Sequence, residues 1–318
     1  MKKRLVALFL ILVLAVCVVL QAGASQAPYE VTLILKDNTA AGWRYLSAAA
    51  IAQGKEIGVN VTETSPLETQ NADEQYKAME DAIEKDVDAI IIAPVDSAGI
   101  VPAIKRANEA GIPVFTTNTR AFVDNEDEVV SFAGVENEQG GYDVAKYMFS
   151  QFPADKEVKL IIIDGNRTGQ TTLDRIAGME RALAEFPNVN LIDIQEAKFA
   201  RAQAQEIMES FLIKHKEIDL VMALNDEMAI GAYNAIVSAG REKEMLISGF
   251  DGTPEGLQAI LDGQISASLN QDQPEQGAAS VRTVKAYLDG EEVEKWVKVG
   301  GEICLPDNAE ELLLKLQK

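Results

Sequence analysis

The sequence predicts an α/β fold with two doubly wound lobes, each a parallel sheet covered by helices on both faces. Short apolar segments alternate with longer amphipathic segments along nearly the whole chain, which is the pattern of repeated β-α units. The apolar segments are near-continuous rather than alternating, as expected of strands buried on both faces. A length of 318 residues, of which 47% are hydrophobic and 25% charged, fits about two globular domains.

The expected strands are short and rich in Val, Ile and Leu: Val31–Lys36, Val59–Glu63, Ala89–Pro94, Val114–Thr117, Leu160–Asp164, Leu191–Gln195, Leu220–Ala223 and Leu246–Phe250. The expected helices between them have a helical hydrophobic period: Trp43–Ile57, Ala72–Lys85, Gly99–Ala110, Thr172–Phe186, Ala202–Lys214 and Met228–Ala239. Gly58, Gly111 and Gly240 stand at the ends of three of these helices, where a left-handed cap favours glycine.

A coarse internal repeat predicts where one lobe ends. VTLILKDN at 31–38 and VKLIIIDGN at 158–166 are both apolar strands that end in polar residues and open a series of β-α units. We therefore expect a boundary near Val135–Glu136. A polar, proline-bearing stretch at Gln271–Pro274 then leads back to the first lobe. The expected lobes, joined by a hinge of three crossings, are residues 28–135 with 272–299 and residues 136–271 with 300–318.

The N-terminus has the parts of a secretory signal peptide. Lys2, Lys3 and Arg4 precede an uncharged apolar run from Leu5 to Leu20, and small residues end at Ala24. We expect cleavage after Ala24, so that residues 1–24 are the signal peptide and the mature protein is periplasmic. An uncleaved anchor stays open, as does a lipid on Cys17, which is disfavoured because the preceding residue is not small.

Charge excludes nucleic acid as a partner. The formal net charge is −21, and loss of the three N-terminal cations makes it −24 in the mature chain. Such a surface repels phosphate backbones and anionic membranes. Only Cys304 remains after cleavage, so no intramolecular disulfide can form.

The sequence also lacks the motifs of most enzymes and metal proteins. Its one histidine, His215, stands between two lysines, and no C-x-x-C, H-E-x-x-H, Walker or calcium-loop motif occurs. We expect no enzymatic activity, no metal and no cofactor. A pair of carboxylates acting on a glycoside, such as Asp37 with Asp251, stays open because the sequence does not set their spacing.

Polar side chains and two aromatic rings, Trp43 and Phe199, follow the expected strands. Ligands of open α/β sheets bind at the carboxyl ends of the strands. The residues there include Lys36, Trp43, Asn118, Asn225 and Asp251. Carboxylates, amides and cations suit hydroxyl groups, and aromatic faces suit the C–H faces of a sugar ring. We expect Asn225 to face a ligand, and Asp226 and Glu227 mainly to start a helix.

Two motifs carry a family resemblance. LNDEMAIGA at 224–232 and GFDGTPEG at 249–256 resemble the ribose-binding protein family, the substrate-binding subunits of sugar ABC importers. The resemblance extends from Val31 to about Val299. It implies the type I periplasmic binding fold with two Rossmann-like lobes. By position it implies a ligand-binding set, which is Lys36, Trp43, Asn118, Phe199, Asn225, Asp251 and Gln271.

Departures from the family pattern concern specificity. In the first loop Ala40 replaces an asparagine and Ala41-Gly42 replaces a proline-phenylalanine pair, so one stacking ring is missing. Leu173 is expected at the position of a second-lobe arginine. Strict ribose specificity is therefore not expected, and another pentose, a hexose or a polyol fits as well.

The resemblance implies a monomer that captures a monosaccharide or polyol and delivers it to a membrane ABC permease. A chemoreceptor as a second partner stays open. The alternative is a sugar-sensing receptor or a LacI-like effector domain, but a repressor would carry a basic DNA-binding segment where this chain has an apolar one.

Overall fold

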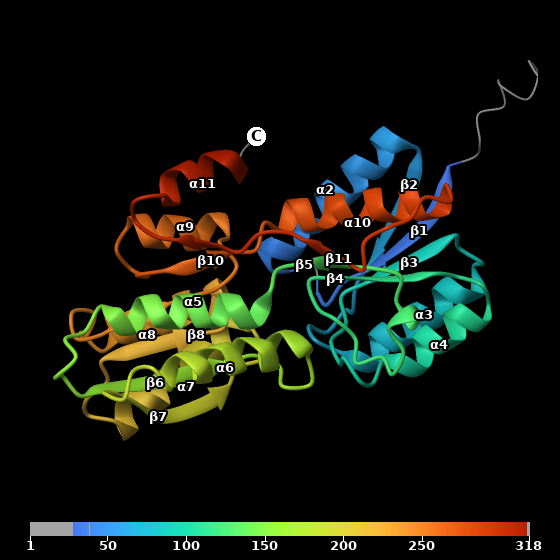
Figure 1. Cartoon of the computed structure of the whole chain (residues 1–318). Helices are drawn as coiled ribbons and strands as arrows, with labels where there is room; N and C mark the ends of the chain where they lie inside the picture. Colours follow the sequence, from blue (N-terminus) through green and yellow to red (C-terminus); the bar gives the residue numbers. More distant parts are fainter. Residues whose placement is uncertain (1–27, 38, 317–318) are drawn as a thin grey trace, which may run out of the picture.

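The computed structural model describes residues 28–37 and 39–316. The expected signal peptide at 1–24 and Cys17 lie outside the described residues. The described chain forms two α/β halves joined side by side, with the strands of each half between layers of helices (Figure 1).

The first half, here called the first lobe, is built on a six-stranded parallel sheet of order β11-β5-β4-β3-β1-β2. Its strands are β1 (Tyr29–Ile34), β2 (Val59–Thr64), β3 (Ala89–Ile92), β4 (Val114–Thr117), β5 (Phe132–Gly134) and β11 (Trp296–Lys298). Helices cover both faces: α2 (Ala41–Ile57) and α10 (Gln273–Leu288) on one, α3 (Ala72–Glu84) and α4 (Val101–Glu109) on the other. A 3-10 turn, η1 (Glu126–Glu128), lies before β5.

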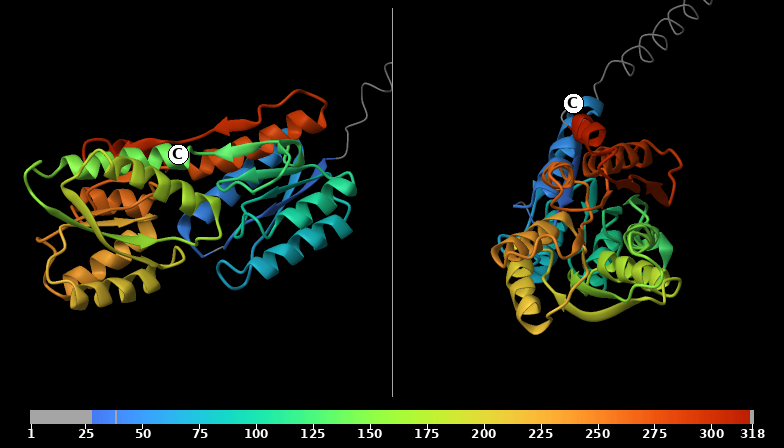
Figure 2. Two further views of the ribbon diagram at one scale, coloured as in Figure 1. Left: turned by 60° about the horizontal axis from the view of Figure 1, so that its bottom comes forward. Right: turned by 90° about the vertical axis from the view of Figure 1, so that its left-hand side faces the viewer.

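The second half, the second lobe, contains a four-stranded parallel sheet of order β7-β6-β8-β9. Its strands are β6 (Val158–Asp164), β7 (Val189–Glu196), β8 (Leu220–Ala223) and β9 (Leu246–Ser248). Figure 2 shows the sheet between two helix layers, α5 (Asn137–Ser150) with α6 (Gln170–Leu183) and α7 (Arg201–Lys214) with α8 (Asp226–Ser238). Beside them lie α9 (Pro254–Leu261), α11 (Ala309–Leu316) and an antiparallel pair, β10 (Ser268–Asn270) with β12 (Glu302–Cys304).

The chain passes between the lobes three times, from β5 to α5, from β10 to α10 and from β11 to β12 (Figure 1). Backbone hydrogen bonds hold the crossings together: Val299 N donates to Gly134 O at 3.2 Å, and Gly301 N donates to Asn270 O at 2.8 Å. The predicted fold class, two doubly wound lobes on a three-crossing hinge, is therefore confirmed.

The burial of each strand explains how clearly its sequence predicted it. The central strands β3, β4 and β8 are fully buried, and their sequences are continuous apolar or threonine-containing runs. The edge strands β2 and β7 are half-exposed, and their sequences are mixed. The expected left-handed glycines are confirmed, with φ of 77° at Gly58, 82° at Gly111 and 70° at Gly240.

The α5 helix was not among the expected helices because Gly140 and Gly141 interrupt its pattern, and glycine disfavours a helix interior. The structure gives the reason for Gly141, since a Cβ there would collide with Arg175 O of α6. Gly178 of α6 has the same role, because a Cβ there would collide with Glu138 O of α5. The two helices therefore approach backbone to backbone, which positions α6 against the sheet.

This close approach predicts the effect of Gly178→Ala. Although alanine favours helices over glycine, the added methyl has to push α5 away, so we expect a loss of about 1–3 kcal/mol in the free energy of unfolding. Urea unfolding followed by circular dichroism measures it. Ala177→Leu, at an exposed position of the same helix, is the control and should change stability by less than about 0.5 kcal/mol. Equal midpoints for Gly178→Ala and wild type would contradict the packing argument.

Candidate functional site

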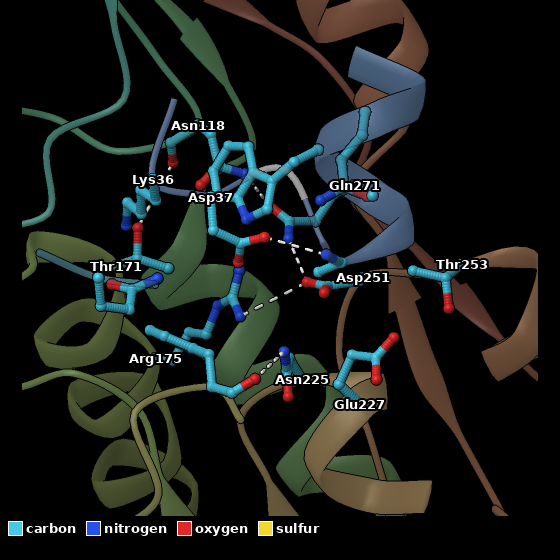
Figure 3. Close-up of a pocket in the computed structure, with 16 residues that line it drawn as sticks. Lys36, Asp37, Asn118, Thr171, Arg175, Asn225, Glu227, Asp251, Thr253 and Gln271 are labelled. Carbon is cyan, nitrogen blue, oxygen red and sulfur yellow. Dashed lines mark hydrogen bonds and ion pairs between the residues drawn. The ribbon is translucent and has the colours of Figure 1, made fainter. Parts of the chain in front are cut away.

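A cavity lies between the two lobes at the carboxyl ends of their strands (Figure 3). The empty space in it amounts to about 520 Å³, a volume that includes the part open to solvent. All seven residues of the expected binding set line it: Lys36, Trp43, Asn118, Phe199, Asn225, Asp251 and Gln271. The structure thus brings the whole set together, while their contact with a ligand stays a prediction.

Strand ends position most of these side chains. Lys36 follows β1, Asn118 follows β4, and Phe199 follows β7. Asn225 follows β8, and Asp251 follows β9. Because parallel strands of one sheet end at the same edge, each lobe presents its polar side chains along one line, and the two lines face each other across the cavity.

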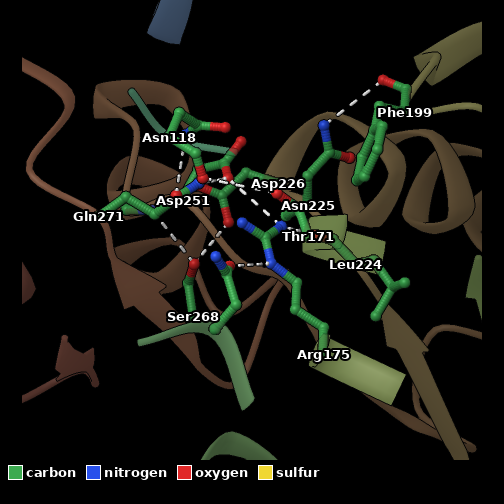
Figure 4. A network of polar contacts seen from close by, with 12 residues as sticks. Asn118, Thr171, Arg175, Phe199, Leu224, Asn225, Asp226, Asp251, Ser268 and Gln271 are labelled. Atoms are coloured by element: carbon green, nitrogen blue, oxygen red, sulfur yellow. Dashed lines mark hydrogen bonds and ion pairs between the residues drawn. The ribbon is translucent and has the colours of Figure 1, made fainter. Parts of the chain in front are cut away.

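A continuous chain of polar contacts runs across the base of the cavity (Figure 4). Asn118 Nδ2 donates to Gln271 Oε1 at 3.0 Å, and Gln271 Nε2 donates to Asp251 Oδ1. The same carboxylate oxygen lies 3.8 Å from Arg175 Nη1. Arg175 also donates through Nε to Asn137 Oδ1 at 2.9 Å and through Nη1 to Leu224 O, and it stacks on Phe250 at 3.6 Å. This chain joins the first lobe, the hinge and the second lobe.

Asn225 combines capping with exposure to the cavity. Its Oδ1 accepts from Met228 N at 2.9 Å, which makes it the N-cap of α8. Its Nδ2 reaches Phe199 O at 3.4 Å, a long bond that leaves donor capacity toward the cavity. Asp226, as expected, is structural: its buried carboxylate accepts from Thr253 N at 2.8 Å and from Ser268 Oγ at 2.6 Å.

Lys36 lies between the two aromatic rings of the cavity. Its Nζ is 5.9 Å from the ring centroid of Trp43 and 5.9 Å from that of Phe199. The residue is 3% exposed. Within residues 28–37 and 39–316, this nitrogen makes no hydrogen bond. The ammonium can therefore donate to a guest without breaking an existing bond.

Burial shifts the protonation of the charged groups at the cavity. Burial, and to a smaller extent the positive charge of Arg175, lower the pKa of Lys36 to about 7 against the opposing effect of Asp251 and Asp37. Burial raises the pKa of Asp251 well above its usual range, against the attraction of Arg175. Burial lowers the pKa of Arg175 to about 10, so this side chain stays cationic at neutral pH.

Unusual backbone conformations gather at the cavity. Four of its lining residues are non-glycine residues with positive φ: Gln70 at 63°, Asn118 at 60°, Phe199 at 63° and Asp251 at 126°. Such conformations cost free energy and concentrate at ligand sites, where the surrounding structure enforces them. Their clustering here makes the cavity a candidate functional site on grounds independent of its polarity.

Sequence reasoning placed one residue wrongly. Leu173 was expected where a second-lobe arginine would stand, but it lies on the surface, 44% exposed, and Arg175 lines the cavity, 1% exposed. The buried residues of α6 include Thr171, Arg175 and Met179, four apart, so the inner face of the helix runs through Arg175. This four-residue spacing, counted back from Gly178 and Met179, could have identified Arg175 from the sequence as the inward-facing residue.

Two further lining residues, Asp37 and Gln273, are not in the expected binding set. Asp37 Oδ1 accepts from Thr39 N at 2.6 Å and Ala40 N at 3.0 Å, which shapes the first loop beside the cavity. Gln273 fills the space opposite Gly42, where a Cβ would collide with the glutamine amide. An amide thus occupies the space that a larger side chain at Gly42 would need.

The described part of the chain contains neither a metal-binding cluster nor a membrane-spanning helix. Residues 28–37 and 39–316 contain no group of three or more His, Cys, Asp or Glu side chains arranged to hold a metal ion. Within the same ranges no helix combines the length and apolarity that crossing a membrane requires. His215 ends α7, where its Nε2 lies 2.8 Å from Asp193 Oδ2, and it does not line the cavity.

Comparison with known proteins identifies the family. A family model described as the periplasmic binding protein domain matches residues 31–292. The ribose import binding protein of Escherichia coli is 32% identical over 250 residues, covering 78% of this chain and 81% of the relative. The galactofuranose-binding protein of Escherichia coli is 30% identical over 312 residues, covering 96% of this chain and 97% of the relative.

A solved structure agrees with the sequence comparison. The periplasmic binding component of the arabinose ABC transporter of Shewanella sp. ANA-3, bound to α- and β-L-arabinofuranose, has a TM-score of 0.84 and 27% identity. The match covers 91% of this chain and 95% of that one. The chain belongs to the periplasmic binding protein family, and the resemblance inferred from its motifs is confirmed.

The buried ammonium predicts a pH-dependent effect of Lys36→Met. The lysine has an ordinary pKa of 10.5 and a folded pKa of about 7. Between these values the unfolded state binds more protons, so folding becomes more favourable as the pH rises. The substitution removes the cost of the buried charge. We therefore expect the unliganded variant to melt above wild type at pH 7, with the difference shrinking toward pH 10.

Differential scanning fluorimetry from pH 7 to 10 measures this difference. Lys77→Met, at an exposed position of α3, is the matched control. A difference between Lys36→Met and wild type that stays constant across this range would show that the Lys36 ammonium carries no folding penalty.

Proposed function

We propose that this protein is an exported solute-binding protein that captures a monosaccharide or polyol between its lobes and delivers it to an ABC importer permease. The observation that carries the proposal is the cavity itself, in which hydrogen-bonding groups of both lobes and two aromatic rings converge. The relatives support it, since they are named for ribose and galactofuranose, and a similar solved structure holds arabinofuranose.

The lining groups match the surface of a sugar. Each hydroxyl both donates and accepts, so Asp251 and Asp37 accept from hydroxyls while Lys36 and Arg175 donate to them. Asn225 does both. The rings of Trp43 and Phe199 pack against the C–H faces of the guest. Charge-assisted hydrogen bonds of this kind are strong when the guest is removed from water, which closure of the lobes achieves.

Closure is the signal to the permease. Residues 28–135 with 272–299 and residues 136–271 with 300–318 move as two bodies about the three crossings. A ligand that contacts both lobes binds the closed form better and shifts the population toward it. The permease then recognises the closed form of the monomer.

Export follows from the N-terminal segment. Lys2, Lys3 and Arg4, the apolar run and the small residues up to Ala24 direct the chain across the cytoplasmic membrane, with cleavage after Ala24. The mature protein then works in the periplasm, where a strongly acidic surface favours solubility.

A thermal-shift screen tests the proposed function. Ribose, arabinose, galactose, fructose and myo-inositol are added separately to the purified mature protein. A ligand that binds only the folded state raises the melting temperature by mass action. Calorimetric titration of the sugar with the largest shift then gives its affinity. No shift with any sugar or polyol at millimolar concentration would refute the proposal.

The proposed site predicts that Asp251→Ala and Asn225→Ala each weaken binding of that sugar by about 1–3 kcal/mol, because each leaves ligand hydroxyls unpaired in a closed cavity. This corresponds to roughly five- to 150-fold in Kd. Asp155→Ala, at an exposed position outside the cavity, is the control. Unchanged affinity in both cavity variants would move the binding site elsewhere.

A further inference from the structure

The α6 helix has no N-terminal cap within its own lobe. Its N-cap residue, Gly169, has extended backbone angles of −92° and 133° and no side chain that could cap. The first N–H groups of a helix need an acceptor from outside the helix. In this structure the Gln170 N–H donates instead to Ser97 Oγ at 2.9 Å.

Ser97 belongs to the opposite lobe. It lies in the turn between β3 and α4, on the first sheet, and it is 0% exposed. Its hydroxyl donates to Arg120 O at 2.7 Å, again within the first lobe. With the hydroxyl proton directed to Arg120, a lone pair of Ser97 Oγ is free to accept from Gln170. The cap is therefore supplied across the gap between the lobes.

Neighbouring contacts fix the same pair of segments. Ser97 N donates to Thr168 O at 3.0 Å. Val95 O accepts from Asn166 Nδ2 and from Thr168 Oγ1, both at 3.3 Å. The turn that precedes α6 thus docks on the β3–α4 turn through bonds that involve no ligand.

We propose that Ser97 is a positioning residue for closure: it caps α6 only when the lobes are closed, and it thereby sets sugar affinity without touching the sugar. Neither Ser97 nor Gln170 lines the cavity. Thr171 and Arg175, which do line it, lie in the first two turns of the capped helix. The effect on affinity rests on the proposed function, whereas the effect on closure does not.

The size of the effect follows from helix capping. Removal of a Ser cap changes the equilibrium of the capped state by about two- to thirty-fold. Because this cap exists only in the closed form, its loss lowers the closed population by that factor. The apparent Kd rises by up to the same factor, since a ligand binds in proportion to the competent population.

Ser97→Ala removes the acceptor, and Gln170→Pro removes the donor from the other lobe. Proline is well tolerated at the first position of a helix, so α6 keeps its backbone hydrogen bonds and loses only the side-chain bond from Gln170 Nε2 to Asp174 Oδ1. Asn71→Ala is the matched control, because Asn71 Oδ1 accepts from Glu74 N at 3.0 Å and so caps α3 within the first lobe alone. All three variants lose a helix-cap hydrogen bond, but only two lose one that joins the lobes.

The closed population is measured by double electron–electron resonance between nitroxides at Lys77→Cys on α3 and Glu206→Cys on α7, both exposed, while Cys304 is buried. The distributions are recorded without sugar and with increasing concentrations of the sugar found by the thermal-shift screen. We expect Ser97→Ala and Gln170→Pro to lower the closed-to-open ratio about two- to thirty-fold and to raise the Kd by up to the same factor. We expect Asn71→Ala to change neither.

The double variant distinguishes the interlobe bond from separate damage to each lobe. If the two groups act on each other, the double variant loses no more than the larger single loss. Additive losses, or a closed-to-open ratio of Ser97→Ala equal to that of wild type, overturn the inference. A wild type that binds no sugar refutes the proposed function instead, and the ratio without sugar then decides the role of Ser97.

Discussion

The buried polar chain from Asn118 through Gln271 and Asp251 to Arg175 is the constraint on which the rest of the structure depends. Charged groups removed from water destabilise a protein unless partners satisfy them. Here the partners come from three places: Asn118 from the first lobe, Gln271 from a hinge crossing, and Arg175 from α6 of the second lobe. This series of polar contacts is complete only when the carboxyl ends of both sheets face each other. The position of the cavity is therefore tied to the position of the lobes.

Other residues of the cavity keep unused hydrogen-bonding capacity. The side-chain oxygen of Asn225 caps α8, while its amide nitrogen stays near the cavity. Lys36 is held between Trp43 and Phe199, and its ammonium makes no hydrogen bond to any other residue that the structure describes. A scaffold that satisfied every group internally would leave nothing for a guest. This one satisfies enough groups to hold the geometry and leaves the others aimed inward.

Such a site is costly to stability, and the two cores offset the cost. A buried ammonium with a lowered pKa and left-handed residues such as Phe199 and Asp251 are each unfavourable by themselves. They sit beside strands that are buried on both faces and helices that pack as closely as α5 and α6 do at Gly178. The tight packing of each lobe holds these unfavourable features in place.

The sequence by itself determined the fold class, the three-crossing hinge and the family, because these depend on hydrophobic period, strand length and motifs that are local in the chain. Its strand ends, such as Asn118 and Asp251, and its family motifs together also pointed to seven residues that line the cavity, while their contact with a ligand stays a prediction. The sequence alone did not place Arg175, because Leu173 stands two positions away and only the packed face of α6 shows which side chain points inward. It gave no sign that Ser97 caps a helix of the other lobe. Contacts between residues distant in sequence depend on how two finished lobes meet, and the tertiary structure alone decides that.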